Sequence, residues 1–483
     1  MTDKSHGGHH PSTTTTDGSA PDYQRHRSRR EFMRTLTSGS AVALFDQRIL
    51  RPQLVQAARQ EGAHPLAPRP SHFPARAKNL ILVNLTGGLS HIDSFDYKPR
   101  LQADHGKVMD WRGRPFYLNA SPFRFSPKGN AGLMVSELFP MLGSTIDDMA
   151  VIRSMVTDHI SHGQATLAMH CGLTTIPMPS IGSWISYGLG THNLNLPPFV
   201  VLASALPYMG SQVWDASFLP AYHTGTRLIP GNDPVPHLKS PLPSLSLREL
   251  EQEMLQKLNR KHLIERQNDP QLDARIATFN TAAGMMKVAP QVLDLESETN
   301  GARSRYGIQA GDKQSIAWQL LAARRMVEHG VRVVEVVHTG SGGNWDSHGD
   351  MAHHRNLARQ IDQPLAALIQ DLKLRGMFDE TLVAICTEFG RAPAGTKNEK
   401  GRNHHNSAFT CLLAGGGIRG GTLYGQSDEY GNLVVENPVH VHDLHATILH
   451  ILGLDHEELT YHYAGRDFRL TDVHGQVLSD ILI

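Results

Sequence analysis

Cysteine and net charge are both nearly absent from this chain. Among its 483 residues, cysteine occurs only at Cys171, Cys386 and Cys411, and none of these forms a Cys-x-x-Cys pair. The sequence therefore predicts neither a disulfide framework nor a zinc knuckle. The 46 basic and 46 acidic side chains cancel, so nothing electrostatic favours nucleic acid or an anionic membrane surface as a partner.

A long apolar run is also lacking in the N-terminal region. The apolar run at residues 36–45 is too short to span a bilayer, so we expect no stable membrane span. It follows Ser28-Arg-Arg-Glu-Phe-Met-Arg34, which matches a twin-arginine export signal. We therefore expect residues 1–57 to be a signal region and the protein to be exported to the periplasm or beyond; a basic disordered tail is the alternative. Four prolines predict an extended linker over residues 58–77.

The rest of the chain alternates between apolar strand patterns and helix patterns. Buried strands are predicted at residues 79–85, 149–153, 198–203, 331–337, 381–386 and 409–414. Helices are predicted at residues 163–172, 246–265, 270–287, 314–329, 354–376 and 442–452. This alternation predicts an α/β fold with a mostly parallel central sheet flanked by helices. Residues 243–300 form a predicted helical insertion, interpreted as a hairpin that caps the sheet.

Histidine is abundant, with 29 residues, and several lie in polar loops that follow the predicted strands. These loops comprise residues 87–96, 158–162 and 344–350, together with Glu388 and residues 403–405. Because the carboxyl ends of parallel strands meet at one edge of a sheet, we expect the four loops to converge. Mixed carboxylate and imidazole ligands, such as Asp346 and His348, suit zinc or manganese better than calcium.

Three of these positions have alternative interpretations. Residues 158–162 precede a predicted helix, whose N-terminus favours a phosphate or sulfate group; ordinary N-capping by Asp158 or Ser161 is the alternative. Arg391 either binds an anionic group or forms an internal salt bridge. Of His404 and His405, one is interpreted as a metal ligand and the other as a supporting or surface residue.

Several ordered motifs resemble the DUF1501 family. They are residues 85–99, Trp345-Asp-Ser-His348, Glu388-Phe-Gly-Arg391, Gly401-Arg-Asn-His404, residues 413–421 and the tail from 441–449 to 465–470. The resemblance covers about residues 78–483 and implies a single domain there. It further implies an alkaline phosphatase-like fold, because the family is grouped with the alkaline phosphatase/sulfatase superfamily, and an exported protein of the planctomycete type.

The resemblance also implies roles for individual residues. Asp346 and His348 resemble the metal-binding pair, Glu388 resembles the acidic ligand, and His404 resembles the late histidine ligand. Thr86 stands where the superfamily has an aspartate ligand, so Asp93 or His91 has to substitute. The nucleophile position falls on His162, which then serves as the nucleophile or as a further ligand; Ser161 is the alternative nucleophile.

These expectations define an exported metal-dependent hydrolase of phosphate or sulfate esters, either small molecules or polysaccharides. One or two divalent ions, zinc or manganese, are expected to polarise the ester. His162 or Ser161 attacks or positions water, and Arg391 stabilises the developing negative charge. The alternatives are an isomerase or mutase, and a catalytically inactive, metal-stabilised binding or envelope-associated protein. No feature of the sequence predicts an oligomeric state.

Overall fold

The computed structural model describes residues 64–111, 114–236, 238, 244–266 and 269–483. The signal region predicted at residues 1–57 lies outside these residues. From residue 64 onward, the proline-rich segment lies along the domain. The backbone N–H groups of Arg69, His72 and Arg76 donate to the carbonyls of Leu189, Gly453 and Ile451.

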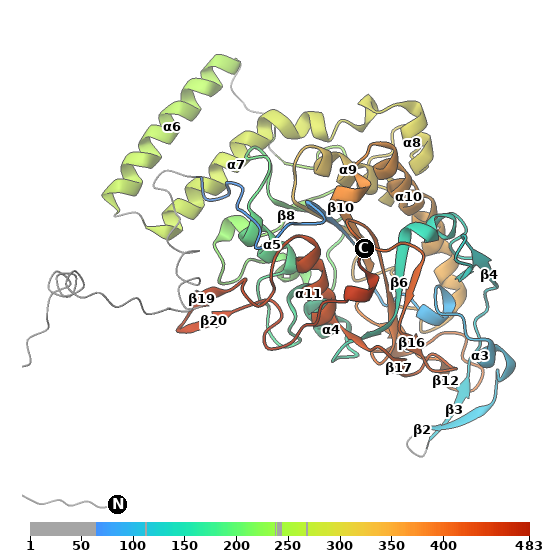
Figure 1. Cartoon of the computed structure of the whole chain (residues 1–483). Coiled ribbons are helices and arrows are strands. Elements are labelled where there is room, and N and C mark those ends of the chain that lie inside the picture. Colours follow the sequence, from blue (N-terminus) through green and yellow to red (C-terminus); the bar gives the residue numbers. More distant parts are fainter. Residues whose placement is uncertain (1–63, 112–113, 237, 239–243, 267–268) are drawn as a thin grey trace, which may run out of the picture. The chain divides into compact units, whose positions relative to one another are not determined.

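A nine-stranded sheet forms the centre of the domain (Figure 1). Its order is β15 (Thr422–Tyr424), β6 (Met149–Val156), β14 (Phe409–Gly415), β10 (Thr381–Cys386), β1 (Asn79–Leu85), β9 (Val333–His338), β7 (Phe199–Leu202) and β8 (Thr226–Leu228), and β18 (Val439–His440) also pairs with β6. All of these strands run in one direction except β14, which is antiparallel to both β10 and β6. The carboxyl ends of β1, β6, β9 and β10 and the amino end of β14 therefore share one edge. The mostly parallel sheet is confirmed.

Alternating side chains of each strand face two layers of helices. On β1, Ile81 and Val83 belong to a core cluster with residues of α9 (Ile316–Glu328) and α10 (His354–Leu374). Leu80 and Leu82 belong to the opposite cluster, which includes residues of α4 (His162–Cys171), α5 (Ile181–Leu189) and α11 (Val441–Ile451). Apolar residues on both faces explain why these strands read as continuous apolar runs.

The predicted insertion is helical, and its two long helices differ in burial. Ala274, Ala277, Met285 and Ala289 of α7 (Pro270–Val292) are buried. The side chains of α6 (Leu245–Glu265) are largely exposed; Leu250 and Met254 are 63% and 62% exposed. The short helix α8 (Asn300–Tyr306) follows, and α8 contacts both α9 and α10. The helical insertion is as predicted, but α6 does not bury an apolar face against the sheet.

One short helix and several short strands lie in the loops at the edges of the sheet. They are α3 (Pro99–Ala103), β2 (Val108–Trp111), β3 (Arg114–Leu118), β4 (Phe125–Lys128), β5 (Leu133–Ser136), β11 (Gly390–Arg391), β12 (Ala394–Gly395), β13 (His404–His405), β16 (Gln426–Ser427), β17 (Val434–Glu436), β19 (Tyr461–Tyr463) and β20 (Arg466–Phe468). Two of the pairings lie close to the site described below. Strand β13 pairs with β11, and β12 pairs with β3 of the β2–β3 hairpin. Within the described ranges, no helix combines the length and the apolar character needed to cross a membrane.

Candidate metal centre

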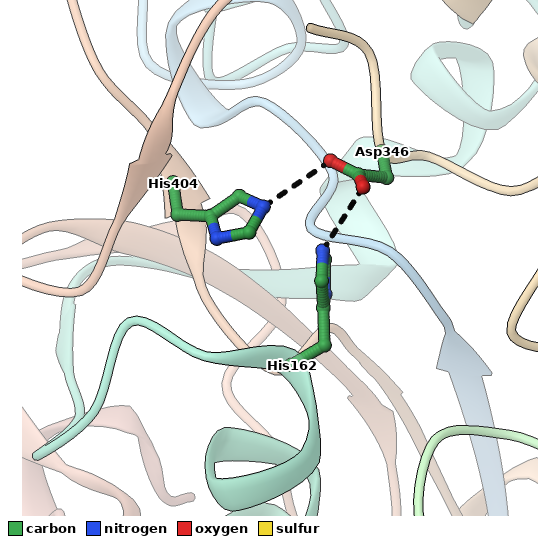
Figure 2. Close-up of side chains that lie close together, drawn as sticks. All are labelled: His162, Asp346 and His404. Carbon is green, nitrogen blue, oxygen red and sulfur yellow. Dashed lines mark hydrogen bonds and ion pairs between the residues drawn. The ribbon is translucent and has the colours of Figure 1, made fainter.

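Three side chains from distant parts of the sequence meet at the shared edge of the sheet. His162 is the first residue of α4 and follows β6, Asp346 follows β9, and His404 lies in β13, just before β14. One ligand atom of each lies within 4.8 Å of the others, and Figure 2 shows both imidazoles directed at the carboxylate. The parallel strands bring these residues together because they deliver their loops to the same edge.

Asp346 lies between three imidazoles. Its Oδ2 is 3.3 Å from His162 Nε2, and its Oδ1 is 3.3 Å from His404 Nε2. His348 joins the group, with its Nε2 3.0 Å from Asp346 Oδ1 and 3.0 Å from His404 Nε2. The ring nitrogens of His162 and His404 and the carboxylate of Asp346 form the type of donor set that can hold zinc or another transition-metal ion, and His348 lies next to this set.

Glu388 orients His162 rather than facing the other ligand atoms. Its Oε1 lies 2.7 Å from His162 Nδ1, so a proton on Nδ1 leaves Nε2 free to act as a ligand. The backbone N–H of Gly87 donates to both Glu388 oxygens, at 2.8 and 3.1 Å. Gly87 has a φ of +111°, and a Cβ there would lie 2.6 Å from the backbone nitrogen of Trp345. This close approach explains the glycine that follows Thr86.

The charges of the group set the direction of its pKa shifts. Burial alone would lower the pKa of His162, but hydrogen bonds and charges from Asp346 and Glu388 raise it overall. Burial opposes ionisation of Asp346, yet hydrogen bonds from His162 and His404 and the Arg391 charge hold its pKa well below the usual range. Asp346 is therefore an anion, as a metal ligand has to be.

The Arg391 side chain is buried and forms its hydrogen bonds with other residues of the protein. Its side chain is fully buried and donates to the carbonyls of Gly87, Gly88 and Arg402 and to Asp346 Oδ1, the last at 2.6 Å. All three of its guanidinium nitrogens therefore have protein acceptors. This placement corresponds to the internal salt-bridge alternative, and Arg391 fixes the position of Asp346.

His91 and Asp93 lie outside the group formed by His162, Asp346 and His404. Asp93 is fully buried, and its carboxylate accepts hydrogen bonds from Arg402 Nε at 2.7 Å, from Arg402 Nη2 at 3.2 Å and from the Ser90 hydroxyl at 2.5 Å. His91 Nε2 donates to the carbonyl of Gly431 at 2.8 Å. These contacts hold the loop after β1 in place.

Ser161 and His405 are the sequence neighbours of His162 and His404. Ser161 is the N-cap residue of α4, but its side chain makes no capping hydrogen bond. The hydroxyl of Ser161, which precedes His162 in the sequence, is therefore not used to cap the helix. His405 is buried, its pKa is lowered by burial to about 4, and its Nε2 lies 2.5 Å from the carbonyl oxygen of Asn432. Of the two adjacent histidines, His404 thus faces the centre and His405 supports the strand.

Tyr208 is a residue of the centre that the sequence analysis missed. Its ring stacks on His162, with centroids 4.3 Å apart and planes 9° from parallel. Its hydroxyl accepts from Asn344 Nδ2 at 3.0 Å. Tyr208 follows β7 at the same edge of the sheet, so the strand-end rule that selected the other loops could have found it.

A cavity of about 420 Å³ adjoins the centre, and His404 forms part of its wall. The Nδ1 of His404 donates to the carbonyl of Ile160, another lining residue, at 2.8 Å. The ring of His404 therefore has its Nε2 at the centre and its other edge toward the cavity.

The family profile described as a protein of unknown function (DUF1501) matches residues 77–482. The chain belongs to the DUF1501 family. A comparison with curated proteins found no match.

Among solved structures, the chain is similar to several proteins with TM-scores of 0.34 to 0.35. They include a phosphonate monoester hydrolase from Silicibacter pomeroyi (10% identity, 84% of this chain and 76% of that chain, TM-score 0.35). A protein in the alkaline phosphatase superfamily from Vibrio parahaemolyticus shows 10% identity over 82% of this chain and 75% of that chain, with a TM-score of 0.35. The lipoteichoic acid synthase from Listeria monocytogenes shows 10% identity over 84% and 78%, with a TM-score of 0.34.

Proposed function

We propose that this DUF1501 protein is an exported, metal-dependent hydrolase of phosphate or sulfate esters with an alkaline phosphatase-like domain. The observation that carries the proposal is the convergence of His162, His348 and His404 on Asp346. His162 Nε2 is buried without a hydrogen-bond partner of good geometry, although it points at Asp346 Oδ2 from 3.3 Å. A buried ring nitrogen left in this state costs free energy, which a bound cation would recover.

Zinc or manganese fits this donor set better than calcium or magnesium. Hard cations prefer oxygen ligands, whereas the two imidazoles of His162 and His404 with the carboxylate of Asp346, and His348 beside them, suit borderline transition metals. When bound, such an ion polarises an ester oxygen and lowers the pKa of water. Glu388 holds His162 in the ligating tautomer, and Arg391 fixes Asp346. Ser161, which precedes His162 in the sequence and makes no capping hydrogen bond, is the nucleophile candidate.

A metal-stabilised binding protein is the second candidate. It is favoured by the position of His162, whose Nδ1 contacts Glu388 and whose Nε2 faces Asp346, because a histidine that holds a metal cannot also attack an ester. In this case the ion joins the loops and no turnover follows.

Metal analysis of the purified full-length chain, combined with an ester screen, tests the proposal. We expect near-stoichiometric zinc or manganese and hydrolysis of at least one of three esters: p-nitrophenyl phosphate, bis(p-nitrophenyl) phosphate and p-nitrophenyl sulfate. His404→Ala is expected to lose metal and turnover, whereas His353→Ala, which changes an exposed histidine close to the same centre in sequence, is expected to retain both. His404→Ala is preferred to Asp346→Ala because removing Asp346 leaves the buried Arg391 unpaired.

Each result separates the candidates. Bound metal without turnover on any ester supports the binding protein. Absence of metal from the folded protein overturns both candidates. The group is then an ion-pair cluster in which Arg391 balances the charge of Asp346 without a metal.

A further inference from the structure

Among the residues that the structure describes, none that lines the cavity beside His404 is Lys, Arg, Asp or Glu, in contrast to the adjoining centre. Its described lining residues include Met109 and Phe116 of the β2–β3 hairpin, Pro393, Asn403, Asn406 and Ser407. The two histidines of the wall are His404, which faces the metal centre, and the buried His405. A charged group that entered this cavity would lose its hydration without gaining an ionic partner.

The polar groups of the lining suit hydroxyl groups. Asn403, Asn406, Asn432 and Ser407 carry amide and hydroxyl groups that both donate and accept hydrogen bonds. Asn406 Nδ2 already donates to the carbonyl of Thr157 at 2.8 Å, and its Oδ1 accepts from Ser407 Oγ at 3.5 Å, which leaves one lone pair of this oxygen as an acceptor. A ligand with several hydroxyl groups matches such a lining because each hydroxyl can act as donor or acceptor.

The rest of the lining is apolar. Met109, Phe116, Ile160 and Pro393 present carbon surface, and the Phe116 ring offers a flat face. A ligand that combines hydroxyl groups with C–H faces satisfies both kinds of wall. The volume of about 420 Å³ lies within the range of small-molecule sites, and it is open to a sugar-sized group.

We propose that this cavity binds the uncharged, hydroxyl-rich part of the ester substrate, a neutral sugar-like group, while the adjoining centre receives the phosphate or sulfate. The inference rests on the proposed function, which it deepens by naming the organic part of the substrate. It excludes substrates whose organic part is itself anionic, such as uronic acid esters, and substrates with a cationic organic part.

Matched esters and a charge inserted into the cavity test the inference. The probes are mixed pools of monophosphate and monosulfate esters of neutral methyl hexosides and of the corresponding methyl hexuronides. The wild type is expected to hydrolyse the neutral pool with a kcat/KM at least tenfold above that of the hexuronide pool. Ser407→Lys, which places a cation in the lining, is expected to reverse this preference through KM. Ser144→Lys, which adds the same charge at an exposed serine outside the lining, is the control that retains it.

Binding measurements keep the two proposals apart. Calorimetry with the unesterified methyl hexosides and hexuronides reports on the cavity without any turnover, and the thermal unfolding of both variants reports on folding. Selective binding of neutral hexosides that Ser407→Lys abolishes, in a protein that hydrolyses no ester, supports the cavity and overturns the hydrolase. Turnover with equal kcat/KM for both pools, or a preference that Ser407→Lys leaves unchanged in a folded protein, overturns the cavity inference and leaves the hydrolase standing.

Discussion

At the scale of single residues, the centre depends on side chains from loops that are far apart in the sequence. Asp346 and His348 were predicted from their spacing after a strand, and the structure places both beside His404. The partner of Asp93 could not be predicted, because Arg402 lies 309 residues further along the chain. Short-range spacing identifies ligand types, whereas ion pairs between distant loops depend on the finished fold.

Glu388 is the residue whose expected role changes most. Because it bonds His162 Nδ1 at 2.7 Å, we expect Glu388→Gln to weaken metal binding by roughly 10- to 100-fold while leaving the fold intact. The amide can still contact Nδ1 but no longer supplies the charge that raises ligand basicity. Metal titration of the apo-protein with a competing chelator measures the change. An unchanged affinity in Glu388→Gln would show that Glu388 does not support a metal ligand.

At the scale of elements, the strands were predicted well and some helices were not. The boundaries of β1 and β10 match the predicted residues 79–85 and 381–386, because strands buried on both faces consist of apolar residues throughout. Helix α5 was missed because Gly182 and Gly188 disfavour a helix locally. A Cβ at Gly182 would lie 2.5 Å from the Phe199 ring, so tertiary packing, invisible in the sequence, requires the glycine.

The loop of residues 344–350 and the segment before β13 meet at Gly401. A Cβ at this glycine would lie 1.9 Å from the carbonyl oxygen of His348 and 2.7 Å from the nitrogen of Gly349. Both are backbone atoms, so we expect Gly401→Ala to push the two segments apart, lower the free energy of unfolding by about 1–3 kcal/mol and weaken metal binding. Gly349→Ala, where a Cβ has nothing within 4 Å, is the control for urea unfolding and metal titration. Equal stability of the two variants would contradict the close contact.

Helix α4 is joined to the sheet by a buried ion pair between His170 and Glu335 of β9, 2.9 Å apart. Burial lowers the pKa of His170, but the Glu335 charge and hydrogen bond raise it overall. A raised folded-state pKa stabilises the protein fully below the unfolded pKa of about 6.5, and this stability is lost as pH rises through the folded value. We therefore expect the free energy of unfolding to fall above pH 6.5 in the wild type. The double variant His170→Gln/Glu335→Gln, measured by urea unfolding from pH 6 to 9, should lack this part of the slope; identical slopes would refute the pair's contribution.

At the scale of the whole molecule, histidines buried in separate elements make the fold sensitive to acid. Burial lowers the pKa of His338 to about 4 and the pKa values of His354 and His445 to about 3. His445 shows the physical reason, because its Nε2 donates to the carbonyl of Met169 while its buried Nδ1 has no partner for a second proton. These side chains are therefore neutral in the folded protein and titrate near pH 6.5 in the unfolded chain.

A lowered folded-state pKa of a histidine means that acid favours the unfolded chain. As pH falls from 6.5 to 5, the unfolded chain takes up protons that the folded protein cannot accept, so each of the three groups removes up to roughly 2 kcal/mol. We expect the free energy of unfolding to drop steeply across this window. His445→Gln keeps a donor for the Met169 carbonyl but cannot be protonated, so it should reduce the difference between pH 7 and pH 5 by about 2 kcal/mol. His353→Gln, at an exposed histidine, should leave the difference unchanged in the same urea titrations. A wild-type stability that is flat between pH 7 and 5 would mean that these histidines take up protons inside the fold.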